Sequence, residues 1–80
     1  MYYVYILKNP KQFYTGYTTD LRRRLKEHVS NRSLSTKNKG PWKLVYYEAC
    51  TSSTDAIIRE KYLKTAWGKR YIKSRIKHSL

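Results

Sequence analysis

The chain has 80 residues, of which 40% are hydrophobic and 15% aromatic, too apolar a composition for a disordered protein. No apolar run in the sequence approaches the ~20 residues of a membrane span, and we expect no secretion signal. A lone cysteine, Cys50, excludes an internal disulfide. We therefore expect one small cytoplasmic domain, residues 1–80, with no role in a membrane.

The charge is strongly one-sided, because 18 Lys and Arg residues face five Asp and Glu residues, for a net charge of +13. Such a field attracts polyanions and steers their approach. Nucleic acid is favoured over an anionic membrane because no basic helix has a wide apolar face. A generally basic protein with no particular partner remains compatible with composition alone.

The first half of the chain begins with a predicted hairpin. Residues 2–7 are aromatic and β-branched, as in a strand, with Tyr5 on one face and Val4 on the other. Asn9 and Pro10 supply turn chemistry, and residues 13–17 form the returning strand. Gly16 within that strand indicates a place where another group approaches the backbone closely.

A basic helix should follow, capped by Asp20 or a preceding threonine and ending near Val29. Helical spacing places four residues on one side: Leu21, Arg24, Leu25 and His28. It places three on the other, as solvated or phosphate-contacting charges: Arg22, Arg23 and Lys26. We expect Arg24 and His28 to be partly buried and directed at the tyrosines. The alternative is that Arg24 only borders the core and reaches into water.

Residues 30–42 are predicted to form a long loop, since they are rich in Ser, Asn and Lys and contain Gly40-Pro41. Loops of this length are usually functional or mobile. Lys37 and Lys39 are candidate contacts to a phosphate backbone. A solvated connection without a function explains the composition equally well.

The second half is predicted as a strand and two helices. Residues 43–49 form the strand, and a helix over residues 55–67 buries Ala56, Leu63 and Trp67. Gly68 is expected to end that helix as a C-cap. Residues 69–77 then form a short basic helix with Ile72 and Ile76 directed inward.

Glu60 falls in the predicted buried stripe of the longer helix. Carboxylates are almost never buried unless a cation accompanies them. The candidates are a metal ion, Arg24 or a neighbouring lysine, and the stripe alone does not choose among them.

An ordered set of motifs now stands out: Val4-Tyr5, Tyr14-Thr15-Gly16, Arg24, His28 and Glu60. The set resembles the GIY-YIG nuclease superfamily, which includes the nuclease domains of UvrC and the Slx endonuclease subunit. The chain looks most like the stand-alone bacterial YhbQ-like proteins. The resemblance implies an α+β fold, a small three-stranded antiparallel sheet flanked by helices.

The resemblance also implies roles for five residues. Tyr5 and Tyr14 match the tyrosines of the two motifs, Tyr5 as general base, and Arg24 matches the arginine that contacts the reacting phosphate. His28 falls where relatives carry histidine or tyrosine. Glu60 matches the carboxylate that holds the divalent metal, Mg²⁺ or Mn²⁺.

This set can support hydrolysis of a phosphodiester. Arg24 can fork onto two phosphate oxygens, and His28 can relay a proton. Because a tyrosine pKa near 10 is high for a base, we expect the cations of the site to lower the pKa of Tyr5.

The predicted function is a metal-dependent endonuclease acting on structured or damaged DNA, in repair or recombination. DNA is expected ahead of RNA, contacted by Arg22, Arg23, Lys26, Lys37 and Lys39, with a protein partner as a candidate source of specificity. The alternative is a module of the same fold that binds nucleic acid without cutting it. An RNA-associated factor rests on charge alone.

Overall fold

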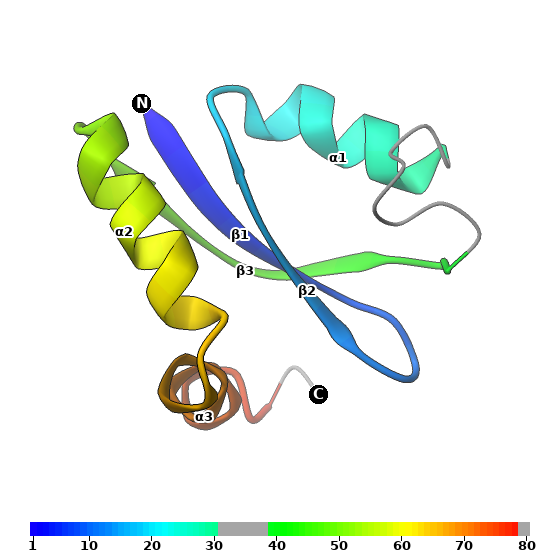
Figure 1. Cartoon of the computed structure of the whole chain (residues 1–80). Helices are drawn as coiled ribbons and strands as arrows, with labels where there is room; N and C mark the ends of the chain where they lie inside the picture. The colour runs from blue at the N-terminus through cyan, green and yellow to red at the C-terminus, as the bar shows by residue number, and fades with distance from the viewer. Residues whose placement is uncertain (31–38, 79–80) are drawn as a thin grey trace.

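The computed structural model describes residues 1–30 and 39–78. Its elements are β1 (Tyr2–Lys8), β2 (Phe13–Thr18), α1 (Leu21–Val29), β3 (Lys43–Cys50), α2 (Ser53–Leu63) and α3 (Ala66–Arg75). The three strands form one antiparallel sheet in the order β2-β1-β3 (Figure 1). The predicted fold class is confirmed.

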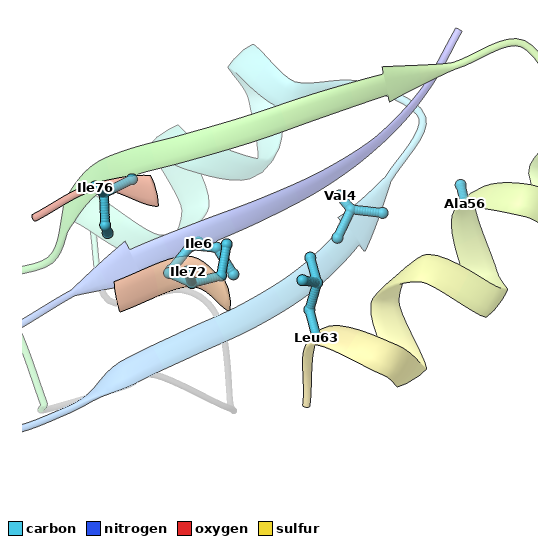
Figure 2. Close-up of a cluster of buried hydrophobic side chains, with 6 residues drawn as sticks. All are labelled: Val4, Ile6, Ala56, Leu63, Ile72 and Ile76. Atoms are coloured by element: carbon cyan, nitrogen blue, oxygen red, sulfur yellow. The ribbon is translucent and has the colours of Figure 1, made fainter. Parts of the chain in front are cut away.

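The central strand β1 serves both faces of the sheet because its side chains alternate. Val4 and Ile6 point to the face covered by α2 and α3, where they join a buried cluster (Figure 2). The other members of that cluster are Ala56, Leu63, Ile72 and Ile76. Burial of these aliphatic groups is the main force that holds α2 and α3 on the sheet.

The opposite face of the sheet carries the aromatic half of the molecule. Tyr5 and Leu7 are buried there with Trp42, and α1 packs over them through Leu21 and Leu25. Figure 1 shows α1 on the other side of the sheet from α2 and α3. One strand therefore contributes alternately to an aliphatic core and to an aromatic one.

The turn between β1 and β2 is built on Asn9, which is buried. Its Oδ1 accepts hydrogen bonds from the backbone N–H groups of Lys11 (2.9 Å) and Gln12 (2.7 Å). Its Nδ2 donates to the carbonyl of Lys39 at 2.8 Å. The predicted turn is confirmed, and Asn9 also ties it to the segment that leads into β3.

The predicted boundary between the last two helices is wrong. The longer helix ends at Leu63 and not at Trp67. Thr65 caps the N-terminus of α3, because its side chain accepts a hydrogen bond from the N–H of Gly68 at 3.1 Å. Gly68 lies inside α3, where a Cβ would overlap the backbone of Tyr62 and Leu63. Gly68 thus allows α3 to pack against the end of α2, and Trp67 is 68% exposed instead of buried.

Other expectations for the second half hold. Ile72 and Ile76 are buried, as are Ala56 and Leu63. The predicted loop over residues 30–42 falls largely on residues 31–38, which lie outside the described residues. Within the described ranges, no helix has the length and apolarity needed to cross a membrane.

Candidate active site

The site is centred on Tyr5, which is fully buried in the middle of β1. Its partner across the sheet is Gly16 of β2. A Cβ built at Gly16 would overlap the Cζ and hydroxyl oxygen of Tyr5 and would lie 2.9 Å from its Cε1. The expectation of a close approach at Gly16 is confirmed, because the glycine leaves the space in which the Tyr5 ring lies across β2.

His28 of α1 meets the hydroxyl group of Tyr5. The Oη of Tyr5 and the Nε2 of His28 are 2.8 Å apart, and His28 is only 1% exposed. Burial lowers the pKa of His28, the charge of Arg24 lowers it further, and Glu27 opposes the shift. The imidazole is therefore neutral near pH 7, and its Nε2 can accept the Tyr5 proton in the tautomer that is protonated on Nδ1.

Arg24 lies one turn before His28 on the same side of α1, as the helical spacing predicted. Its Nη1 donates to the Oε1 of Glu27 at 2.9 Å, and the guanidinium also bonds to the Tyr5 hydroxyl. Its side chain is 30% exposed, so it reaches from the buried phenol to solvent. Arg24 is thus directed at the tyrosine and also open to a ligand. Both predictions for its side chain, partial burial beside the tyrosines and access to water, describe part of its position.

The expected lowering of the Tyr5 pKa is wrong. Burial raises the pKa of Tyr5 to about 12, and the hydrogen bond from Arg24 offsets only part of this effect. The electrostatic effects of Tyr14 and Glu60 raise the pKa of Tyr5 as burial does. A cation lowers a phenol pKa only when its attraction exceeds the cost of removing the phenolate from water. Because the Tyr5 ring is fully buried, this cost exceeds the attraction of Arg24, and the pKa rises.

Tyr14 completes the aromatic wall of the site. Its ring centroid lies 5.2 Å from that of His28 and 6.4 Å from that of Tyr5. On its far side, the ring of Trp42 meets it edge-on at 6.2 Å. The four rings pack as a cluster that fixes the positions of Tyr5 and His28.

Glu60 approaches from α2, on the other side of the sheet. Its side chain is 20% exposed, and its Oε2 lies 3.3 Å from the Nζ of Lys64, one turn later. Of the three cations considered, a neighbouring lysine accompanies it. The charge of Glu60 still raises the pKa of Tyr5, although less than burial and Tyr14 do. Glu60 is thus within electrostatic range of the cluster formed by Tyr5, His28 and Arg24.

The donor set at Glu60 fits one kind of metal site. Among the residues that the structure describes, no three His, Cys, Asp or Glu side chains gather to enclose an ion. One carboxylate with water and substrate oxygens is how proteins commonly hold Mg²⁺. The residues present would therefore fit a divalent ion that keeps most of its water ligands.

Comparison with known proteins decides the family. A family model, the GIY-YIG catalytic domain, matches residues 1–73. The chain belongs to the GIY-YIG family. A UPF0213 protein of Clostridium perfringens is 42% identical over 66 residues, which cover 80% of this chain and 71% of that protein. One from Haloquadratum walsbyi is 36% identical over 66 residues, covering 80% and 74%.

A solved structure agrees with this assignment. The solution NMR structure of a UPF0213 protein from Bacillus halodurans has 38% sequence identity and a TM-score of 0.58. The match covers 91% of this chain and 82% of that one. The similarity predicted from the motifs, to stand-alone members of the GIY-YIG family, is confirmed.

The GIY-YIG fold leaves the outer side of α1 to charged side chains. Arg22, Arg23 and Lys26 are exposed there, as predicted. Lys39 is exposed beside the β1–β2 turn, whereas Lys37 lies outside the described residues. An open groove of about 490 Å³ runs beside the start of α1. Its walls are formed by Tyr3, Thr19, Asp20, Leu21, Arg22, Leu25 and Tyr47.

Two residues of the site were missed from the sequence. Glu27 orients Arg24, and its pKa is held low by that hydrogen bond. The spacing of three residues on one helix was a signal that could have identified the pair. Trp42 is the last residue of the predicted loop, and no periodic pattern assigns it to the cluster.

Proposed function

We propose that this protein is a metal-dependent endonuclease that hydrolyses phosphodiester bonds in structured or damaged DNA. The observation that supports this most directly is the contact of 2.8 Å between the Tyr5 hydroxyl and a buried His28. Arg24 bonds to the same hydroxyl and remains partly open to solvent. A proton acceptor and a phosphate ligand therefore meet at one atom.

The proton path uses Tyr5 and His28 together. With a pKa of about 12, Tyr5 is almost entirely protonated near neutral pH and cannot act as a free phenolate. Instead, a water proton passes to the Oη of Tyr5 while the Tyr5 proton passes to the Nε2 of His28. The resulting hydroxide attacks phosphorus, the bond to the leaving sugar oxygen breaks, and that oxygen takes a proton from solvent.

Arg24 stabilises the charge that grows on the phosphate. Its guanidinium is fixed by Glu27 at 2.9 Å, so its direction is set before the substrate arrives. A planar guanidinium can contact two oxygens of one phosphate, which a lysine cannot do. Donors arranged in advance around a developing negative charge are among the largest contributions to catalysis.

Glu60 is the residue that would hold Mg²⁺ or Mn²⁺. When bound, such an ion acts as a Lewis acid at the phosphate oxygens. Lys64 contacts the Oε2 of Glu60 at 3.3 Å and would compete with such an ion for that oxygen. Lys64 is 56% exposed at its side chain and can move into solvent.

DNA is proposed to lie along the outer side of α1, where Arg22, Arg23 and Lys26 are exposed. Contacts of this kind reach the sugar-phosphate backbone and carry no sequence information. Selectivity would then come from the shape of the substrate or from a protein partner, and repair or recombination intermediates offer such shapes.

Cleavage of labelled DNA tests this function. Duplex, branched and single-stranded DNA and single-stranded RNA are incubated with Mg²⁺, with Mn²⁺ and with EDTA. We expect metal-dependent cleavage that Tyr5→Phe and Glu60→Gln each abolish. Tyr46→Phe is the matched control, since it removes a tyrosine hydroxyl bonded to Glu48 on the opposite face of the sheet.

Two outcomes contradict the proposal. Full activity of purified Tyr5→Phe or Glu60→Gln protein would remove these residues from the mechanism. Absence of cleavage by every protein, with tight salt-sensitive binding retained, would support a non-catalytic module that binds nucleic acid. The Lys64 contact at Glu60 and the high pKa of Tyr5 are the observations that favour this second function.

A further inference from the structure

The surface formed by α2 and α3, away from the sheet, exposes three aromatic rings. Trp67 is 68% exposed, Tyr62 40% and Tyr71 36%. Trp67 and Tyr71 are separated by one turn of α3, so they lie on the same side of that helix. Exposed rings of this size bury large areas when a ligand binds.

Two guanidinium groups lie among these rings. Arg59 of α2 is 5.3 Å from the ring centroid of Tyr62 and 4.9 Å from that of Tyr71, so it joins the two helices. Arg70 lies over Trp67 at 4.9 Å. We call these five residues the α2–α3 aromatic surface: Arg59, Tyr62, Trp67, Arg70 and Tyr71.

The α2–α3 aromatic surface is held rigid from beneath. Arg59 donates two hydrogen bonds to Glu48 of β3, each 2.9 Å long, and Tyr46 donates a third to the same carboxylate at 2.7 Å. The guanidinium between Tyr62 and Tyr71 is therefore fixed by the sheet. Rings placed in advance lose little conformational freedom when a ligand binds.

The charge around the surface selects the class of ligand. The ten residues of α3 include four basic and no acidic side chains. Arg70 takes part in none of the ion pairs found in the described part of the chain, and Glu60 of α2 contacts Lys64. A second copy of the protein is disfavoured as the occupant, because each copy carries a net charge of +13. A polyanion with flat faces is complementary.

We propose that the α2–α3 aromatic surface binds single-stranded nucleic acid, with unpaired bases stacked on Trp67 and Tyr71 and the backbone drawn to Arg70. Stacking requires free base faces, which a strand offers and a duplex does not. The surface lies on the other side of the sheet from α1 (Figure 1). The inference goes beyond the proposed function and needs neither cleavage nor a metal.

Fluorescence anisotropy with a labelled oligothymidylate tests the inference, in EDTA so that no cleavage can occur. Replacing Trp67 by Ala should weaken binding at least about fivefold, the lower end of what one stacked base contributes. Val29→Ala is the control, because Val29 is 71% exposed at the end of α1. A duplex of equal length should lose little affinity with either variant.

A charge-matched pair separates the site from general electrostatic attraction. Arg70→Gln and Lys73→Gln each remove one positive charge from α3, but only Arg70 contacts an exposed ring. We expect Arg70→Gln to weaken oligothymidylate binding severalfold more than Lys73→Gln. Equal losses for the two variants, or equal losses of single-strand and duplex binding by Trp67→Ala, would overturn the proposal.

The unsubstituted protein supplies a test that does not depend on folding of a variant. Trp42 is only 8% exposed, so acrylamide should quench mainly Trp67. Saturating oligothymidylate should protect that emission from acrylamide, and unchanged quenching would refute stacking on Trp67. If Trp67→Ala instead converts a dimer to a monomer in sedimentation, the surface is a contact between copies and the proposal fails.

Discussion

Replacing Gly16 by Ala is the sharpest test of how the sheet positions Tyr5. The added methyl group would overlap the Cζ and hydroxyl oxygen of Tyr5 and lie 2.9 Å from its Cε1. Neither partner can yield easily, because Tyr5 is fully buried and Gly16 is paired with it in the sheet. Either the ring or strand β2 must move.

The expected cost follows from overpacking. An extra methyl group in a packed site typically costs about 1–3 kcal/mol. In a domain of this size, each kcal/mol lowers the Tm by about 4–8 °C. A shift of the ring would also lengthen the 2.8 Å contact with His28. Misplacement of a reacting group by about 1 Å can lower a rate ~100-fold. The cleavage rate should therefore fall strongly even under conditions where the Gly16→Ala protein remains folded.

Gly40→Ala is the matched control, since a Cβ there would lie at 3.6 Å from the nearest atom, which is ordinary contact. Both substitutions replace a glycine and so restrict the unfolded chain in the same direction. Thermal unfolding measures the loss of stability. The ¹⁵N chemical shift of the His28 Nε2 reports whether its contact with the Tyr5 hydroxyl has lengthened. If Gly16→Ala matches Gly40→Ala in both measurements, Gly16 does not position Tyr5.

Four further predictions concern charge. Because burial lowers the pKa of His28 below 6.5, the unfolded chain binds more protons than the folded one below that pH. The free energy of unfolding should fall on acidification through pH 6.5, by at most about 1.4 kcal/mol per pH unit, and His28→Gln should remove this slope in urea titrations. The pKa of Glu48 is held below 4.5 by its hydrogen bonds with Arg59, so its contribution to stability is lost only as the pH falls below 4.5. Acid unfolding of Glu48→Gln should therefore show a shallower pH dependence there. Lys64→Gln should strengthen Mn²⁺ binding up to about fivefold, measured by paramagnetic broadening of amides near Glu60. Finally, the cleavage rate should level off above the pKa of His28 and not rise tenfold per pH unit toward 12.

Much of the site was predictable because its geometry is local. Strand alternation placed Tyr5 and Val4 on opposite faces of the sheet. The helical period placed Arg24 and His28 on the same side of α1, facing the tyrosines. The three basic residues of α1 are exposed for the same reason. Predictions of this kind depend only on the residue spacing within one helix or strand and not on which elements pack against it.

The failures arose where two elements meet. The apolar pattern from residue 55 to 67 continues through Thr65, whereas in the structure Thr65 caps a new helix and Gly68 packs against the end of α2. The same error hid the exposure of Trp67. Trp42 belongs to no helix or strand, so no periodic pattern predicts its contact with Tyr14.

The pKa of Tyr5 shows why residue identity alone misled the chemistry. Counting cations around a tyrosine predicts a low pKa, but burial is the larger effect on a ring enclosed by the sheet and α1. A phenol with a pKa of about 12 is a weak acid, yet its conjugate base need not accumulate if an acceptor takes the proton as it leaves. In the mechanism we propose, His28 is such an acceptor because the same burial lowers its pKa and favours the uncharged ring. The enclosure that disfavours the phenolate therefore also supplies its proton acceptor, and a level rate at high pH would be the consequence of both effects acting on one hydrogen bond.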